Sequence, residues 1–264
     1  MLEIPKLAIY GEEFDDEGMY NHEGMQEIAR SAKGLTFKRT DNLVDWLFRK
    51  LEEVGMHSMW IEHFIKVGEL SEEAMHQFAE WVGAKKQRYP LIRIGGMLHD
   101  IGKAGYVGED GHGMSLNGEM PMTKKDLKYI RLHPQVGWSY IVMLDPKGAL
   151  SLNKKEIADC VLYHQENWNG SGYPFGLKGK NIPPSARIVS VVDFIDAAGD
   201  KNRIWYPTLS HDKIRSMLKE DAGVTYDPVV AGMFYEMLEE KHVCEYLGLH
   251  NGNCNGASGT RITL

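Results

Sequence analysis

The sequence predicts an all-α fold, a bundle of roughly seven to nine helices, and three observations support this. Apolar residues recur at spacings of three and four through most of the chain, which is the period of an amphipathic helix. Alternating apolar and polar runs, typical of strands, are few. Glycine and proline gather in two irregular segments, 105–121 and 169–184, instead of punctuating short strands. We therefore expect helices that surround two glycine-rich loops.

The helices are expected in a regular order. Thr40 or Asp41 caps a helix whose apolar face includes Leu43 and Leu47, and Ser71 opens another helix with a capping signal. A short helix over residues 24–32 precedes them. Further helices are expected over residues 91–103, from Thr123 towards His133, from Asn153 or Lys154 to His164, and over 183–198, 210–219 and 228–246.

These elements predict one catalytic domain over residues 40–247. Residues 1–39 form an N-terminal extension that is too short for a domain with its own core. Residues 248–264 are rich in asparagine and glycine and predict a disordered tail.

Composition excludes several classes of protein. The formal net charge of -7 argues against general nucleic-acid binding, which needs many contacts from lysine and arginine to phosphate. Three cysteines are no disulfide framework and favour a reducing compartment. The start lacks the basic and apolar pattern of a signal peptide, and no apolar run approaches the roughly 20 residues of a membrane span. A soluble cytoplasmic protein is expected.

His99 and Asp100 form the strongest chemical signal. They are adjacent, both can bind metal, and they end an apolar helix, where an unpaired carboxylate would be costly to bury. A metal ion would account for the aspartate. An ordinary helix end, with Gly102 as cap and Lys103 complementing the helix dipole, accounts for the pair equally well when it is taken alone.

Other metal-capable side chains stand in segments far apart along the chain. Glu53 and His57 are spaced i, i+4 and share one helix face, and Asp193 lies in a run of buried type. The candidate ligands are Glu53, His57, His99, Asp100, His133, His164 and Asp193. Facing helices of a bundle can bring such ligands together. Mixed imidazole and carboxylate ligands suit iron, manganese or zinc better than calcium.

The remaining polar candidates have ordinary interpretations. Asp196 is interpreted as an acceptor that supports a ligand or helix packing. The other histidines are interpreted as ordinary polar residues, namely His22, His63, His76, His112, His211, His242 and His250.

Several motifs in order resemble the HD-GYP family. They are Leu98-His-Asp-Ile-Gly-Lys103, His133-Pro-Gln-Val-Gly137, and His164-Gln-Glu-Asn-Trp-Asn-Gly-Ser-Gly-Tyr-Pro174, followed by Gly176-Leu-Lys-Gly179 and Ile182-Pro183. The match extends from about residue 40 to 240. The resemblance implies the helical fold of the HD superfamily and a bacterial signalling hydrolase that cleaves cyclic di-GMP or cyclic GMP-AMP. It also implies two or three divalent metal ions, often iron or manganese.

The resemblance assigns roles to residues by motif. The family's metal ligands fall on the seven candidates above. Asp100 and Lys103 are the catalytic candidates, and Lys103 and Arg203 contact the substrate phosphates. The loop of Gly172, Tyr173 and Pro174 borders the dinucleotide pocket. Tyr173 or Trp168 could stack on a guanine base, although packing under the loop explains Trp168 slightly better.

Three departures from the family pattern bear on function. The family has two consecutive histidines where this chain has Tyr163-His164, so Tyr163 coordinates as a phenolate, or the site holds fewer metals, or turnover is lost. Residues 105–122 are longer and richer in glycine than usual and could form a lid. The second basic residue that normally follows Arg203 has no clear match.

Three functional hypotheses therefore stand. The first is a cyclic-dinucleotide phosphodiesterase. The second is a module that binds the dinucleotide, or a signalling partner such as a diguanylate cyclase, without turnover. The third is a nucleotide phosphohydrolase of the wider HD superfamily. The Gly-Tyr-Pro loop favours a dinucleotide ligand.

Overall fold

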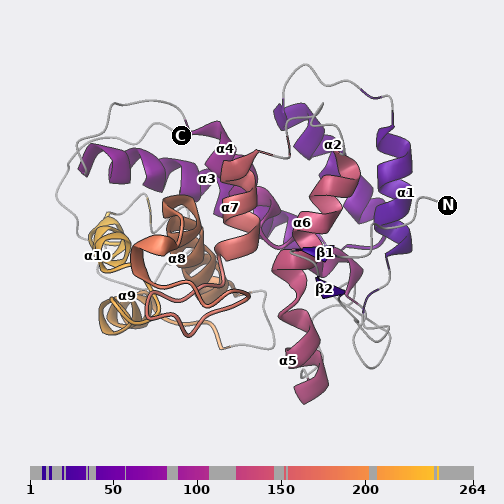
Figure 1. The fold of residues 1–264 in the computed structure, drawn as a ribbon. Coiled ribbons are helices and arrows are strands. Elements are labelled where there is room, and N and C mark those ends of the chain that lie inside the picture. The colour runs from indigo at the N-terminus through magenta and orange to yellow at the C-terminus, as the bar shows by residue number, and fades with distance from the viewer. Residues whose placement is uncertain are drawn as a thin grey trace.

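A computed structural model of the chain describes residues 8–9, 12–13, 20, 22–33, 35, 40–56, 58–81, 89–106, 123–145, 152, 154–201, 207–240 and 243. Within these residues the predicted all-α class is confirmed, with ten α-helices, two 3-10 helices and one small hairpin (Figure 1). The α-helices are α1 Glu23–Ala32, α2 Thr40–Glu53, α3 Ser58–Trp81, α4 Pro90–Leu98, α5 Lys124–Ile130, α6 His133–Leu144, α7 Lys155–Tyr163, α8 Pro184–Gly199, α9 His211–Glu220 and α10 Pro228–Met237. The 3-10 helices are η1 Ile101–Gly105 and η3 Gly179–Asn181, and the antiparallel hairpin pairs β1 Ala8–Ile9 with β2 Glu12–Glu13.

Two hydrophobic clusters form the core. One lies among α1, α2 and α6, and the other among α8, α9 and α10. Helices α3, α4 and α7 lie between these groups in Figure 1 and contribute to both clusters. On α3, for example, Phe64 belongs to the first cluster and Val67 to the second. The boundary between the clusters is therefore built from the helices that carry the strongest sequence motifs.

A glycine allows η1 to lie directly against the start of α6. A Cβ atom on Gly102 would lie 2.0 Å from the carbonyl oxygen of His133, a distance that no side chain tolerates. The His-Asp motif that precedes η1 is thereby brought close to His133, although 33 positions separate His133 from Asp100 by their residue numbers.

Several predicted helix boundaries are wrong. Helix α4 ends at Leu98 and α10 at Met237, short of the predicted residues 103 and 246, and two boundaries near Ser71 and His133 differ as well. Ser71 does not open a helix, because it is buried inside the continuous helix α3. Gly68 does not break α3, since its bare Cα packs where a Cβ would come within 2.6 Å of the Arg93 carbonyl oxygen on α4. His133 begins α6 instead of ending a helix, because Pro134 is tolerated in a first turn, where its missing N–H is not needed.

The N-terminal helix packs against the body of the molecule. The predicted short helix is confirmed as α1, and the hydroxyl of Tyr20, just before it, donates to the carbonyl of Tyr129 at 3.2 Å. His22 Nδ1 and the Tyr140 hydroxyl lie 2.7 Å apart, which ties α1 to α6. The predicted tail over 248–264 and most of the predicted lid over 105–122 lie outside the described residues. None of the described helices combines the length and the apolar character that a membrane crossing requires.

Candidate metal centre

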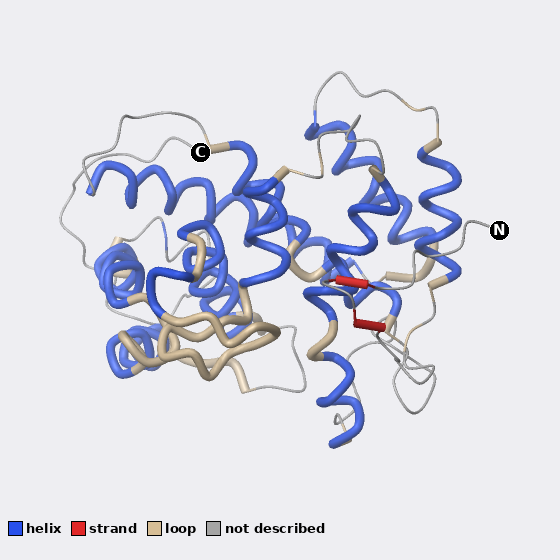
Figure 2. The backbone as a smooth tube through the Cα atoms, in the orientation of Figure 1, coloured by secondary structure: helices blue, strands red, loops and turns tan. Residues whose placement is uncertain are grey.

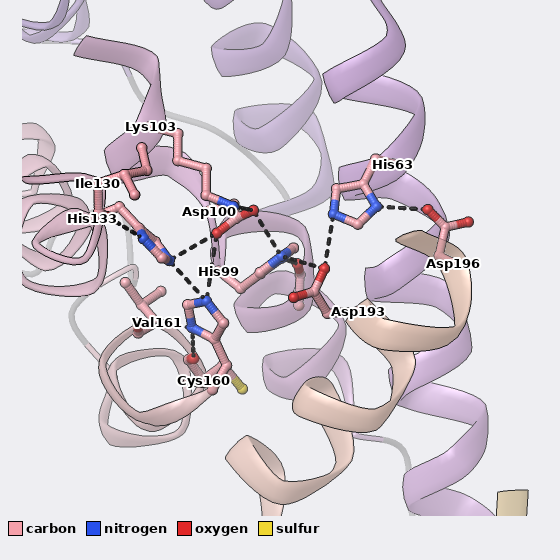
Figure 3. Close-up of polar contacts among 12 residues, drawn as sticks. His63, His99, Asp100, Lys103, Ile130, His133, Cys160, Val161, Asp193 and Asp196 are labelled. Atoms are coloured by element: carbon pink, nitrogen blue, oxygen red, sulfur yellow. Dashed lines mark hydrogen bonds and ion pairs between the residues drawn. The ribbon is translucent and has the colours of Figure 1, made fainter. Parts of the chain in front are cut away.

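Six side chains from five parts of the fold converge where the two hydrophobic clusters meet (Figure 3). His63, His99, Asp100 and Asp193 form one group of possible metal ligands. Asp100, His133 and His164 form a second group, so that Asp100 belongs to both. The structure thus brings together five of the seven ligands expected from sequence and adds His63.

The nitrogen and oxygen atoms of the two groups lie close together. In the first group, Asp193 Oδ1 is 3.2 Å from His63 Nε2 and 3.6 Å from His99 Nε2. In the second, Asp100 Oδ1 is 3.0 Å from His133 Nε2 and 3.5 Å from His164 Nε2. Ligands held at about 2.1 Å from one metal ion lie roughly 3.0–3.4 Å from one another in octahedral or tetrahedral geometry. The observed spacing therefore fits metal coordination.

Each histidine is oriented by its other ring nitrogen. His99 Nδ1 lies 2.6 Å from the carbonyl oxygen of Gly96, and His133 Nδ1 lies 2.7 Å from that of Ile130. His164 Nδ1 is 3.1 Å from the carbonyl oxygens of Cys160 and Val161. A carbonyl can only accept, so each Nδ1 must carry a hydrogen, and the ring presents an Nε2 lone pair whenever it is in its neutral form.

His63 is oriented by a carboxylate. Its Nδ1 lies 2.6 Å from Asp196 Oδ2, one turn along α8 from Asp193. A carboxylate on Nδ1 fixes the ring and makes Nε2 a stronger ligand. The interpretation of Asp196 as a supporting acceptor agrees with this contact.

Two lone pairs face each other in the second group. His133 Nε2 and His164 Nε2 lie 3.1 Å apart. Burial, helped by Lys103, lowers the pKa of His133 to about 4, and burial likewise lowers the pKa of His164. Both rings are therefore neutral at pH 7, and with Nδ1 occupied their Nε2 lone pairs repel. A cation between them turns this repulsion into coordination.

The first group has the opposite character. Burial disfavours a charged ring, but the carboxylates of Asp100 and Asp193 outweigh it and raise the pKa of His99 to about 10. Burial opposes ionisation of Asp100 as well, yet Lys103 and His99 hold its pKa well below the ordinary value. The nearby imidazoles of His63 and His99 outweigh burial in the same way and hold the pKa of Asp193 well below the ordinary value. Two ionised carboxylates in a buried place thus create a strong demand for positive charge.

Unpaired buried atoms in the two groups are consistent with this demand for positive charge. Seven buried side-chain nitrogen and oxygen atoms of the described residues make no hydrogen bond, and three of them are His63 Nε2, His99 Nε2 and Asp100 Oδ1. Orphaned buried polar atoms are rare unless an ion or water completes them. All three belong to the two groups, so the donor set fits divalent metal ions. Thiolate is absent from the set, which excludes a structural cysteine-type zinc site at this place.

Lys103 lies at the edge of the centre. Its ammonium forms an ion pair with Asp100 Oδ2 and lies 5.7 Å from the centroid of the Trp60 ring. Its side chain is 18% exposed, whereas that of Asp100 is 1% exposed, so the lysine links a buried carboxylate to solvent. A fixed positive charge in this position can meet an anionic ligand.

The Gly-Tyr-Pro loop is attached to the end of α7 beside His164. Figure 2 shows it as irregular backbone between α7 and α8. The buried carboxylate of Glu166 accepts from the backbone N–H of Phe175 at 2.7 Å and of Leu177 at 2.9 Å. Gly172 packs against the backbone just after His164, since a Cβ on Gly172 would lie 2.2 Å from the backbone nitrogen of Asn167. Only glycine fits at this position of the loop.

The loop places Tyr173 next to a ligand. Its N–H donates to the Gln165 carbonyl at 3.1 Å, and its ring meets the ring of His133 edge-on at 6.3 Å. Burial, with the charges of Asp100 and Asp193, raises the pKa of Tyr173, so its hydroxyl stays protonated. Sequence reasoning missed Glu166, although a carboxylate two residues after His164 and just before a glycine-rich loop is a usable signal.

Of the two remaining predicted ligands, the structure describes only Glu53, and it does not bring Glu53 into the centre. Glu53 lies at the exposed end of α2, with a side chain that is 60% exposed and pairs with Lys50 at 2.5 Å. His57 lies outside the described residues. The prediction of Glu53 as a ligand is not supported, because α2 ends there and the chain turns before α3 carries His63 into the core.

The other predicted site residues have mixed positions. Arg203 lies outside the described residues. The half-buried ring of Tyr163 contacts the ring of Phe175 in the loop at 5.5 Å. The backbone N–H of Trp168 donates to the Thr225 carbonyl at 2.9 Å, and the Trp168 ring lies 5.7 Å from the Arg187 guanidinium carbon, which favours the packing role over base stacking. The peptide bond before Pro174 is cis.

By class, this is a helical protein whose bundle contains a buried cluster of histidines and carboxylates that could hold metal ions. The chain belongs to the HD domain family, whose model matches residues 56–230. In structure it resembles Bd1817, a HDG"Y"P protein from Bdellovibrio bacteriovorus, with a TM-score of 0.51 and 18% identity over 82% of this chain and 69% of that one. The resemblance to HD-GYP proteins that the motifs indicate is confirmed.

Curated relatives carry names of one kind. A cyclic di-GMP phosphodiesterase of Thermotoga maritima is 30% identical over 74% of this chain and 50% of its own length. A cyclic di-GMP phosphodiesterase of Vibrio cholerae is 28% identical over 72% of this chain and 37% of its own length. A 3'3'-cGAMP-specific phosphodiesterase of the same organism is 26% identical over 82% of this chain and 37% of its own length. The chain thus spans half or less of these relatives.

Proposed function

We propose that the chain is a metal-dependent phosphodiesterase that opens a cyclic dinucleotide, cyclic di-GMP or cyclic GMP-AMP, to the linear dinucleotide. One observation carries the proposal: two groups of ligand atoms share Asp100, and in one of them two neutral histidines direct lone pairs at each other over 3.1 Å. The names of the relatives in Thermotoga maritima and Vibrio cholerae support the substrate class.

The proposed site holds two divalent metal ions. His63, His99, Asp100 and Asp193 would hold one, and Asp100, His133 and His164 the other. Nitrogen and oxygen donors without thiolate suit iron, manganese or zinc, and the resemblance to the HD-GYP family favours iron or manganese. Bound there, the ions would supply Lewis-acid charge and lower the pKa of water enough to provide hydroxide at neutral pH.

The chain's own residues would do the rest. Lys103 offers a positive charge beside Asp100, where it can meet the non-bridging oxygens of a phosphate as their charge grows. Tyr173 keeps a neutral hydroxyl and an aromatic face at the edge of the centre, which can orient a sugar or a base. The ligands His99 and His164 are fully buried, so bulk water is kept from competing for the reacting groups.

The test is turnover. Protein purified without oxygen and loaded with iron or manganese is incubated with each cyclic dinucleotide, and the linear product is measured by chromatography. We expect product from the unmodified chain and a loss of about a hundredfold or more in Asp100→Ala. His76→Ala, on the half-buried face of α3 beside Tyr89, is the control and should keep its activity.

Failure has a defined form. If neither dinucleotide is cleaved with either metal while the chain still binds them, the chain is a binding module that lacks turnover. Cleavage of nucleoside monophosphates or triphosphates in place of dinucleotides would favour a nucleotide phosphohydrolase.

A further inference from the structure

An arginine at the edge of the metal centre has no role in the account so far. Arg131 directly follows the last residue of α5 and stands two residues before the ligand His133. Its side chain is exposed, and its guanidinium carbon lies 4.5 Å from the centroid of the Tyr173 ring. Among the residues that the structure describes, Arg131 pairs with no carboxylate. It is therefore a pre-oriented cation with free donors.

Tyr173 connects Arg131 to the centre. One ring contact joins Tyr173 to the guanidinium, and the other joins it to the imidazole of His133 at 6.3 Å. The loop that carries Tyr173 is held by Glu166, so the ring is a firm support. Stacking on an aromatic ring limits the rotamers of an arginine and leaves its N–H groups free for an anion.

Charge indicates what the arginine would meet. Lys103 pairs with Asp100 at the centre, where the proposed function has it meet the phosphate that reacts. A cyclic dinucleotide carries two phosphodiester groups with one negative charge each. When one of them is at the metal centre, the other projects away from it and needs a second cation. Arginine suits this task because its planar fork binds phosphate through two N–H groups at once.

We propose that Arg131 binds the second, non-reacting phosphate of the dinucleotide and so selects a substrate with two phosphodiesters. This inference rests on the proposed function. A different role for Arg131 is to complement the dipole at the C-terminal end of α5, which would affect stability and leave substrate affinity unchanged.

The experiment compares Arg131→Met with a matched control, Arg215→Met. Arg215 also stacks on a tyrosine, with its guanidinium 4.1 Å from the Tyr235 ring centroid, but on α9 and away from the centre. Two substrates are used, cyclic di-GMP and bis(para-nitrophenyl) phosphate, which has a single phosphodiester. Metal content is measured on each protein.

We expect Arg131→Met to raise the KM for cyclic di-GMP about tenfold, since a charge-assisted phosphate contact is lost. Its kcat for cyclic di-GMP, its activity on the single phosphodiester and its metal content should stay unchanged. The KM of Arg131→Lys for cyclic di-GMP should lie between those of the unmodified protein and Arg131→Met, because lysine keeps the positive charge but lacks the planar pair of N–H donors. Arg215→Met should match the unmodified protein on both substrates.

An unchanged KM in Arg131→Met overturns the inference, and so does an equal loss on both substrates. If the unmodified chain cleaves no dinucleotide, the proposed function fails separately, and the inference is then judged by equilibrium binding of cyclic di-GMP. Binding about tenfold weaker in Arg131→Met upholds it. Equal binding, or no binding by either protein, overturns it.

Discussion

The centre depends on how single imidazoles are oriented. Three of its histidines use Nδ1 to bond a carbonyl three or four residues earlier in the chain, at or just beyond a helix end. These contacts are local, so each ligand is oriented by its own segment. His63 lies in mid-helix, where carbonyls are already used, and takes the carboxylate of Asp196 from α8 instead.

The first prediction tests whether His63 or Glu53 is a metal ligand. His63→Ala removes a buried Nε2 that the structure places 3.2 Å from Asp193, so metal content should fall and turnover should drop about a hundredfold or more. Glu53→Ala changes an exposed surface residue and should leave both unchanged, with stability altered by no more than about 0.5 kcal/mol. Metal analysis and initial rates measure the two effects. The opposite pattern, with Glu53 required and His63 dispensable, would refute this assignment of the ligands.

The candidate ligands that could be recognised from sequence stand at helix ends, in an unusual pair or inside an apolar run. His99, Asp100 and His164 interrupt or end apolar runs, and Asp193 stands inside one, so each is a polar residue in a place that favours apolar ones. His63 has the same signal, since Trp60, Phe64 and Val67 around it are buried. It was missed because Glu53 and His57 have a familiar ligand spacing, and spacing within one helix cannot show which helix face meets the other ligands.

At the level of elements, one buried carboxylate holds a functional loop. Glu166 accepts hydrogen bonds from the backbone N–H groups of Phe175 and Leu177. These contacts hold the loop and thereby fix Tyr173 near His133. Burial raises the pKa of Glu166, and the N–H groups of Phe175 and Leu177 act against this rise. The loop therefore depends on acceptor oxygens that only a carboxylate supplies in full.

The second prediction follows from this contact. Glu166→Gln exchanges one acceptor oxygen for an amide group that faces a backbone donor, which should cost about 1–3 kcal/mol of stability. Because Tyr173 loses its support, the KM for the dinucleotide should rise while metal content is kept. Thermal unfolding and steady-state kinetics measure these effects.

A matched control is Asp145→Asn at the far end of α6. Its carboxylate also is buried and accepts a backbone N–H, that of Leu152 at 2.9 Å. It should lower stability without changing the KM. An equal change of KM in both variants would show that Glu166 has no specific effect on the loop.

Helix positions were largely predictable, and helix boundaries were less so. The pattern predicted α2, α7, α8 and α9 closely, because apolar spacing and capping residues act locally. The starts of α3 at Ser58 and of α6 at His133 were not predicted, because tertiary contacts and position decide them. Gly68 and Pro134 weaken helices by themselves, and both are accommodated here by position, Gly68 by close contact with α4 and Pro134 by the first turn.

For the whole molecule, the centre joins two halves. Asp193 comes from the side of α8 to α10, and His133 comes from α6, which belongs to the other hydrophobic cluster. Metal ions bound in the two groups, which share Asp100, would therefore stabilise the contact of the halves. At a metal concentration about a hundredfold above Kd, the free energy of unfolding should rise by roughly 2.7 kcal/mol, and a chelator should reverse the gain.

The third prediction concerns protons. Since its pKa is raised to about 10, His99 carries a proton at neutral pH when no metal is bound, and that proton must leave before Nε2 can coordinate. Metal binding should release about one proton near pH 7, and affinity should rise with pH. Calorimetry in buffers of different ionisation enthalpy counts the protons. Release of none, with affinity independent of pH, would speak against His99 as a ligand.

The central claim, that residues distant along the chain hold two metal ions through a shared Asp100, can be tested most directly by diffraction. Crystals of manganese-loaded protein, measured for anomalous scattering, should show two peaks. One should lie among His63, His99, Asp100 and Asp193, and the other among Asp100, His133 and His164. A map without peaks among these residues, or with a peak bound by Glu53, would contradict the account.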